Sequence, residues 1–229
     1  MTFHLITLFP PIFDSYVSSS IIGRAVRNKK IKLKFYNPRD FTKDKHRRVD
    51  QKPYGGGPGM VLEAESVVKA IERAIPHPLS LRSAPLLKAG EGKNKKTIVV
   101  WLSPSGKQFD NVYAEKISKK YSDVIIICGR YEGIDARVKK IFKVEEISVG
   151  PYVVTGGELP AMVILDTISR RIPGVLGKIE SVEENRISSS DVYTRPEVLE
   201  YKGKKYRVPK VLLSGHHKKI EEWKRKSRD

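Results

Sequence analysis

Four glycine-containing clusters hold the residues of this chain that are best suited to bind a ligand. They are residues 53–60, 102–106, 128–135 and 148–160. Glycine lacks a Cβ, so the backbone N–H groups of such clusters approach a ligand closely. The first cluster, taken alone, is equally typical of a surface loop. The second and third directly follow apolar runs, and ligands of open α/β sheets bind beyond the carboxyl ends of strands, so we expect these two clusters to form one site.

Several kinds of site are excluded by what the sequence lacks. No cluster matches the phosphate-binding pattern G-x-x-x-x-G-K-[ST] or the dinucleotide-binding pattern G-x-G-x-x-G. His216 and His217 are adjacent, so they cannot share one helical face as metal ligands. The single cysteine, Cys128, allows no disulfide within the chain and ends an apolar run, so we expect it to be buried. No metal site is predicted.

Short β-branched runs alternate with helical patterns, which predicts an α/β fold around a largely parallel sheet. Strands are expected at residues 3–7, 31–36, 97–102, 124–128 and 144–147. Helices are expected at residues 15–27, 64–75, 111–121, 133–142 and 158–172. The last of these is apolar on most faces, so it must be buried in the core or against a second subunit.

Two stretches without periodicity interrupt this pattern. Residues 76–96 are basic and contain proline and glycine, which predicts an exposed loop. Residues 174–190 mix Gly, Ser, Glu and Asn, which is typical of an interdomain linker. The tail that follows is strongly basic. It is either a solvated helix face or an RNA-contacting patch, and the basicity of the whole chain favours the patch.

The charge of the 229-residue chain indicates the class of its partner. Lys and Arg number 44 against 26 Asp and Glu, which gives a net charge of +18. Such a charge favours a polyanion, although ribosome association or a lysine-rich composition would give the same balance. The apolar N-terminus lacks the basic segment and cleavage site of a signal peptide, and no apolar run reaches the roughly 20 residues that span a bilayer. We therefore expect a cytoplasmic protein with no membrane contact.

Seven strings in the sequence resemble the signature blocks of one enzyme family. They are YGGGPGM at 54–60, LSP at 102–104, GRYEGID at 129–135, TGGELPA at 155–161, IPGVLG at 172–177, YTRPE at 193–197 and SGHH at 214–217. In these strings and their order, the chain resembles the bacterial tRNA (guanine-N1)-methyltransferases of the SPOUT superfamily. The resemblance implies transfer of a methyl group from S-adenosylmethionine to N1 of the guanine immediately 3′ of the anticodon in tRNA.

The resemblance also implies a fold and an assembly. The fold would be an α/β SPOUT fold with a deep C-terminal trefoil knot, plus a small, mainly helical C-terminal domain. Residues 1–176 would form the cofactor-binding catalytic domain, residues 177–190 the linker and residues 191–229 a basic tRNA-binding domain. Members of the family are homodimers whose active sites are shared between subunits, which would place the apolar helix at the dimer interface.

Matching the motifs residue by residue implies binding roles. The implied cofactor contacts are Pro104, Gly129, Tyr131, Glu132, Ser148, Val149, Tyr152, Val154, Gly156, Gly157 and Pro160. The implied substrate contacts are Asp50, Tyr54, Gly55, Gly59, Arg195 and His216. Val154 stands where the family has leucine, and valine still offers an apolar side chain to adenine. Glu132 would also help to place Mg²⁺, which the family is reported to use.

The resemblance further implies two catalytic roles. Guanine N1 carries a proton near neutral pH, so a general base must remove it. The aspartate base of the family corresponds to Asn185, and a neutral amide is not a useful base. We expect Glu184 to serve instead, with Glu183 and Asp191 as alternatives.

Negative charge develops toward the guanine O6 atom during the transfer and needs a cation. Arg170 matches the arginine of the family in this role, Arg171 is a fallback, and capping of a helix end is the plainer interpretation.

Asn185 also leaves an alternative function open, that of a catalytically impaired knotted protein that binds tRNA or the cofactor. A SPOUT enzyme acting on ribosomal RNA is a third hypothesis, but the string at 193–197 and the C-terminal appendage fit the tRNA family better.

Overall fold

The structure is a computed structural model of the chain, and it describes residues 1–76, 96–177 and 191–226. These residues fall into two compact units, Met1–Leu176 and Gly177–Asp229, which we describe separately. The predicted loop at 76–96 and the predicted linker at 174–190 lie largely outside the described residues. Among the described helices, none is both long and apolar enough to cross a membrane.

The first unit is built on a five-stranded sheet whose neighbouring strands are all parallel. The strands are β1 (Thr2–Ile6), β2 (Lys32–Tyr36), β5 (Thr97–Gln108), β6 (Asp123–Ile127) and β7 (Glu145–Ser148), in the order β2-β1-β6-β5-β7. Central strand β6 is buried along its whole length. A continuous Val-Ile run suits such a strand, because helices cover both faces of a parallel sheet. The predicted α/β fold with a largely parallel sheet is confirmed.

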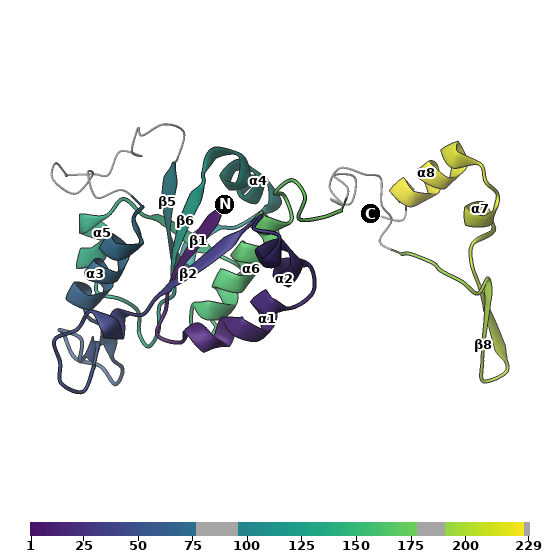
Figure 1. Cartoon of the computed structure of the whole chain (residues 1–229). Helices are drawn as coiled ribbons and strands as arrows, with labels where there is room; N and C mark the ends of the chain where they lie inside the picture. The colour runs from purple at the N-terminus through teal and green to yellow at the C-terminus, as the bar shows by residue number, and fades with distance from the viewer. Residues whose placement is uncertain (77–95, 178–190, 227–229) are drawn as a thin grey trace. The chain divides into compact units, whose positions relative to one another are not determined.

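Helices lie on both sides of this sheet (Figure 1). One side carries α3 (Ala64–Ala74) and α5 (Arg137–Ile141), and the other carries α1 (Asp14–Ser18), α2 (Ser20–Arg27), α4 (Asn111–Lys120) and α6 (Glu158–Ser169). Two 3-10 turns, η1 (Pro10–Phe13) and η2 (Pro38–Asp40), follow β1 and β2. Alternate residues of the strands enter separate cores. Leu5 and Ile126 belong to the core that includes α6, and Ile127 belongs to the core that includes α3.

Three predicted helices differ from the structure. The helix expected at 15–27 is broken between α1 and α2, where Ser20 has a φ of 49° that a continuous α-helix does not contain. The helix expected at 133–142 spans only Arg137–Ile141, because Asp135 accepts a hydrogen bond from the Arg137 backbone N–H in a turn that precedes the helix. The helix expected at 158–172 ends at Ser169.

Residues 103–106 were expected to form a loop that leaves the end of a strand, and this expectation is wrong. Strand β5 continues through them as a bulge, with Leu102 and Lys107 both opposite Ile147 of β7. A Cβ on Gly106 would lie 2.5 Å from the backbone nitrogen of Ile147, so this position has room for glycine alone. Two short antiparallel strands, β3 (Asp50–Gln51) and β4 (Val61–Leu62), were not predicted, since two residues show no alternation.

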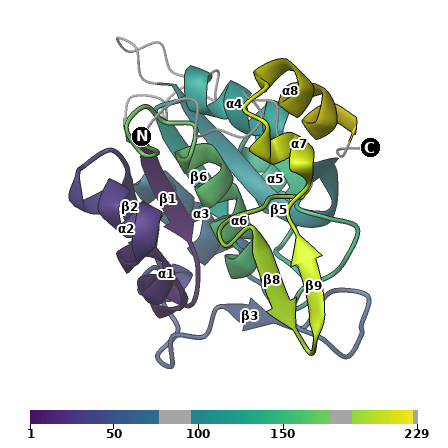
Figure 2. The same ribbon diagram turned by 90° about the vertical axis from the view of Figure 1, so that its right-hand side faces the viewer.

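The second unit contains a hairpin followed by helices (Figure 2). The antiparallel strands β8 (Val198–Tyr201) and β9 (Lys204–Arg207) are joined by Lys202 and Gly203, both with positive φ. That backbone is typical of the two-residue turns that match the twist of a hairpin. Helices α7 (Lys210–Leu213) and α8 (His217–Lys226) follow. The hairpin was not predicted from the sequence.

The contact at Gly106 predicts the effect of adding one methyl group. In Gly106→Ala, the new Cβ would meet the backbone of β7, which cannot move without disturbing the sheet. We expect the free energy of unfolding to fall by about 1–3 kcal/mol, the usual cost of overpacking. Urea unfolding followed by circular dichroism measures the change. Gly177→Ala is the matched control, because a Cβ there meets no atom within 4 Å. Equal stability of the two variants would contradict the assigned strand contact.

Candidate functional site

A pocket of about 280 Å³ lies where β6 ends, beside the bulge of β5, and where α6 begins. Its walls come from three of the four glycine-containing clusters, namely residues 102–106, 128–135 and 148–160. The structure therefore brings the second and third clusters together, the third after the carboxyl end of β6 and the second in the bulge of β5 just past its pairing with β6. This is the location at which open α/β sheets bind ligands.

The residues to which the sequence assigns cofactor contacts lie together. All eleven line this pocket: Pro104, Gly129, Tyr131, Glu132, Ser148, Val149, Tyr152, Val154, Gly156, Gly157 and Pro160. Further lining residues, among them Leu102 and Ile147, make part of the wall apolar. Mostly apolar walls with a few polar groups are typical of small-molecule sites. The contacts of these residues with a cofactor stay a prediction.

Two loops pass each other in backbone contact at the base of the pocket. The Gly157 N–H donates a 2.9 Å hydrogen bond to the Gly129 carbonyl oxygen. A Cβ on Gly157 would lie 2.6 Å from the Cα atom of Cys128, and a Cβ on Gly156 would lie 2.5 Å from the Nε atom of Arg130. These two adjacent glycines are needed because each faces an atom that a side chain would displace.

Glu158, which the sequence analysis did not assign to the site, connects three segments beneath this contact. Its side chain is buried, its Oε1 atom accepts a 2.8 Å hydrogen bond from Thr7, and its Oε2 atom lies 2.9 Å from Arg130 Nε in an ion pair. The Arg130 guanidinium also stacks over Phe9 at 4.7 Å from the ring centroid. A carboxylate at the start of a largely apolar helix was the signal that could have identified Glu158.

The first glycine-containing cluster is hydrogen-bonded to the third. The Glu132 N–H donates to the Met60 carbonyl, and the Leu62 N–H donates to the Gly133 carbonyl, both at 3.0 Å. A Cβ on Gly59 would lie 2.2 Å from Glu132 Cγ, so this glycine packs directly on a pocket residue. The structure thus brings the residue 53–60 cluster to the edge of the pocket.

The predicted substrate residues are distributed over both units. Asp50 lies in β3 opposite Leu62 of β4, and the Tyr54 side chain is fully exposed in the loop that also contains Gly55. Arg195 and His216 belong to the second unit.

Of the three predicted catalytic residues, the structure describes Arg170 alone, and it is not at the pocket. Arg170 ends α6 at the opposite end from Pro160, about 15 Å along the helix axis, and does not line the pocket. Arg171 donates to the Thr167 carbonyl at 3.0 Å, as expected of a residue that caps a helix end. Glu184 and Asn185, together with the alternative base Glu183, lie outside the described residues.

Two further groups limit the chemistry of the site. Burial raises the pKa of the Cys128 thiol, and the Glu158 carboxylate raises it further, so this thiol stays protonated and is not a nucleophile. Within residues 1–76, 96–177 and 191–226, no group of three or more His, Cys, Asp or Glu side chains is arranged to hold a metal ion.

Comparison with known proteins identifies the family of the chain. The family model described as "tRNA (Guanine-1)-methyltransferase TrmD" matches residues 1–229. Three relatives named tRNA (guanine-N(1)-)-methyltransferase come from Pseudoalteromonas atlantica, Clostridioides difficile and Haemophilus influenzae. The first is 43% identical over 98% of this chain and 78% of its own length. The second is 44% identical over 98% of this chain and 91% of its own, and the third is 43% identical over 97% and 84%. The chain therefore belongs to the tRNA (guanine-1)-methyltransferase family.

Proposed function

We propose that this protein transfers a methyl group from S-adenosylmethionine to N1 of the guanine immediately 3′ of the anticodon in tRNA. The observation that carries the proposal is the single pocket in which all eleven matched cofactor positions meet. Membership of the family over the whole chain supports the same reaction. The net charge of +18 suits a polyanionic substrate.

The residues of the pocket fit S-adenosylmethionine. Val149 and Val154 give an apolar surface for an adenine ring, and the loops around Gly129 and Gly156 bring backbone groups within reach of a ligand. Glu132, at the pocket wall, offers a negative charge to a cationic sulfonium. When bound, the cofactor supplies a methyl group activated by the positive charge of its sulfur. We propose the same Glu132 as the residue that helps to place Mg²⁺.

The residues of the chain then have three tasks. The pocket loops hold the methyl donor in one orientation, so that binding free energy offsets part of the entropic cost of reaching the transition state. A base, which we assign to Glu184, takes the proton from guanine N1. Arg170 stabilises the negative charge that develops on guanine O6.

The position of Arg170 supports a homodimer with shared active sites. Because this residue lies about 15 Å along α6 from the pocket of its own chain, it acts in the pocket of a second copy. Leu159 and Val163 of α6 are apolar, yet their side chains are exposed. Their spacing puts them on one side of the helix. We propose this side as part of the dimer interface.

We also propose the finer features that the family implies for the fold and its location. The crossing loops at residues 128–135 and 148–160 would form a deep C-terminal trefoil knot. The second unit, in which α7 and α8 cover more residues than the hairpin, would bind tRNA through Arg195, His216 and its basic side chains. The protein would act in the cytoplasm.

A methyl-transfer assay tests the proposed function directly. The wild-type protein should label a tRNA transcript that has guanine 3′ of the anticodon, and adenine at that position should abolish labelling. Glu184→Gln should reduce the rate at least about 100-fold, the usual contribution of a general base. Asn185→Asp is the control, and it should retain activity. Inactive wild type with activity restored by Asn185→Asp would instead support the alternative, a binding protein that has lost its base.

Mixing two inactive variants tests whether the active site is shared. Arg170→Ala removes the cation, and Val154→Arg blocks the pocket through a partly exposed side chain, so neither homodimer should methylate tRNA. In a random mixture, half of the dimers contain one subunit of each variant. In each of these dimers, one of the two sites combines an intact pocket with an intact Arg170 from the other subunit, so about a quarter of the wild-type rate should return. An inactive mixture, measured with both variants folded by circular dichroism, would mean that Arg170 does not act across subunits.

A further inference from the structure

A second pocket, of about 490 Å³, lies between edge strand β2 and the C-terminal end of α3. It shares no lining residue with the candidate cofactor pocket. The residues that line it are His4, Lys34, Phe35, Tyr36, Arg73, Ala74, Ile75 and Pro76. Two of them are cationic, and none of these described lining residues is acidic. The described part of its wall therefore has the charge of an anion site.

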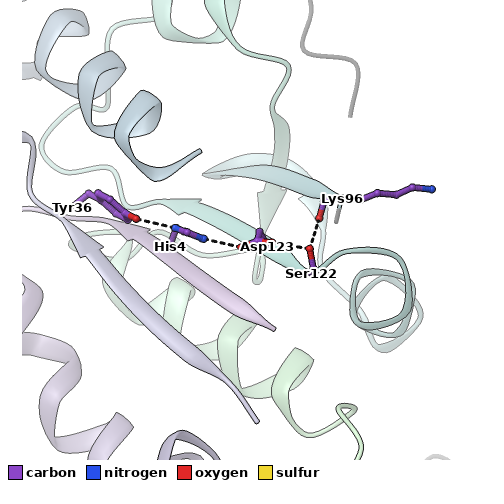
Figure 3. A network of polar contacts seen from close by, with 5 residues as sticks. All are labelled: His4, Tyr36, Lys96, Ser122 and Asp123. Carbon is purple, nitrogen blue, oxygen red and sulfur yellow. Dashed lines mark hydrogen bonds and ion pairs between the residues drawn. The ribbon is translucent and has the colours of Figure 1, made fainter. Parts of the chain in front are cut away.

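A polar network joins two of the pocket residues, His4 and Tyr36, to Asp123 and Ser122 (Figure 3). The imidazole of His4 is 2% exposed and lies between two partners: Nε2 is 3.1 Å from Asp123 Oδ1, and Nδ1 is 3.1 Å from the Tyr36 hydroxyl oxygen. Asp123 Oδ2 also accepts a 2.7 Å hydrogen bond from Ser122, which continues the network across the start of β6. His4 thus fixes the position of the hydroxyl of Tyr36, a residue that lines the pocket.

The positions of the hydrogens in this network depend on whether the His4 imidazole is neutral or protonated. A carboxylate can only accept, so the Nε2 atom facing Asp123 carries a hydrogen. In the neutral imidazole, Nδ1 has no hydrogen and accepts one from the Tyr36 hydroxyl. In the imidazolium, Nδ1–H donates to the Tyr36 oxygen, and the hydroxyl hydrogen is then free to point into the pocket. The network can therefore convert the hydroxyl into a donor for an anion.

Stability does not account for these groups. Replacing both partners of a buried hydrogen bond with apolar groups of the same shape can be nearly neutral or stabilising, so stability alone does not require a His–Asp pair at this position. Lysines on an edge strand such as β2 protect against edge-to-edge pairing, but this role needs no buried partner for Tyr36. A function in ligand binding accounts for the cations and the network together.

We propose that this pocket binds the phosphate group of a small phosphate ester. Lys34 and Arg73 neutralise the phosphate charge, the Tyr36 hydroxyl donates a hydrogen bond to it, and His4 positions that hydroxyl. The pocket is larger than a bare phosphate needs and falls in the range of small-molecule sites, and Phe35 and Ile75 offer apolar contacts to the organic part.

The electrostatic surroundings agree with this assignment. Burial raises the pKa of the Tyr36 hydroxyl, so the hydroxyl keeps its proton for donation. Arg73 is close enough to oppose part of that shift. The charged or titratable groups around His4 are Asp123 on β6, Tyr36 and Lys34 on β2, and Arg73 on α3. The α-amino group of Met1 adds a further cation near Asp123.

Isothermal titration of cytidine 5′-monophosphate into the full-length protein tests the proposal, with cytidine as the ligand lacking phosphate. We expect the monophosphate alone to bind. Lys34→Ala and Arg73→Ala should each weaken its binding about tenfold or more, as expected for lost hydrogen bonds to a charged group. Arg24→Ala removes an exposed arginine from α2, on the other side of the sheet, and should leave binding unchanged.

Side-chain ¹⁵N NMR of His4, assigned by comparison with His4→Gln, gives a readout that simple stabilisation would not change. The monophosphate should convert Nδ1 from acceptor to donor in the wild type, and cytidine should not. In Tyr36→Phe, this response should be lost while the protein remains folded.

Measurements of tRNA binding distinguish a small phosphate ester from an RNA phosphate, and they also provide an outcome that would overturn the proposal. Should the monophosphate not bind, a loss of tRNA affinity of about tenfold in Arg73→Ala but not in Arg24→Ala would assign the site to an RNA backbone phosphate. Unchanged binding of both the monophosphate and tRNA in Lys34→Ala and Arg73→Ala would overturn the proposal. All of these measurements omit methyl transfer, so they are independent of the proposed function.

Discussion

The close approach of two backbones, at Gly157 and Cys128, is the constraint on which the functional site depends. The loop after β6 and the loop before α6 must pass each other at a distance that leaves no room for a Cβ. Gly157 donates to the Gly129 carbonyl at this point, and α6 begins at the next residue. The pocket exists because both loops, held in this contact, present their other surfaces to the same space.

Glu158 extends this contact into the core. Its buried carboxylate holds Thr7 at the end of β1 and Arg130 in the loop after β6, so one side chain joins two strand ends to the first turn of α6. Breaking a buried ion pair by removing one partner is strongly destabilising, because the remaining charge has no compensation. The arrangement of the loops is therefore fixed by a strong local interaction, whereas the rest of α6 is held mainly by apolar packing, with a hydrogen bond from Tyr16 to Asp166.

The sequence predicted the parts of the fold that depend on periodicity. All five strands of the sheet and the α3, α4 and α6 helices were expected near their observed positions, because β-branched runs and amphipathic patterns report burial. It did not predict the break at Ser20, nor the bulge at residues 103–106, which results from the pairing of β5 with β7. The β8–β9 hairpin was missed although Gly203 is a turn signal, because basic residues mask any alternation of apolar positions.

For the site, the sequence correctly grouped the second and third glycine-containing clusters in one pocket, although the second lies within β5 and not after it, and it did not assign Glu158 or the His4 network to any role. A single polar residue in an apolar element carries no periodic signal, and its partner lies far along the chain, as His4 and Asp123 do. The distance of Arg170 from the pocket could not be predicted either, since it follows only from the direction in which α6 leaves the loops.

The affinity of Gly157→Ala for S-adenosylmethionine, measured by isothermal titration, tests the central role of the loop contact most directly. The added methyl group would lie 2.6 Å from the Cys128 Cα atom and would push the loops apart. We predict at least about tenfold weaker binding, together with a stability loss of about 1–3 kcal/mol, while Gly177→Ala binds as the wild type does. Wild-type affinity in Gly157→Ala would contradict the account, because the pocket would then not depend on the backbone contact.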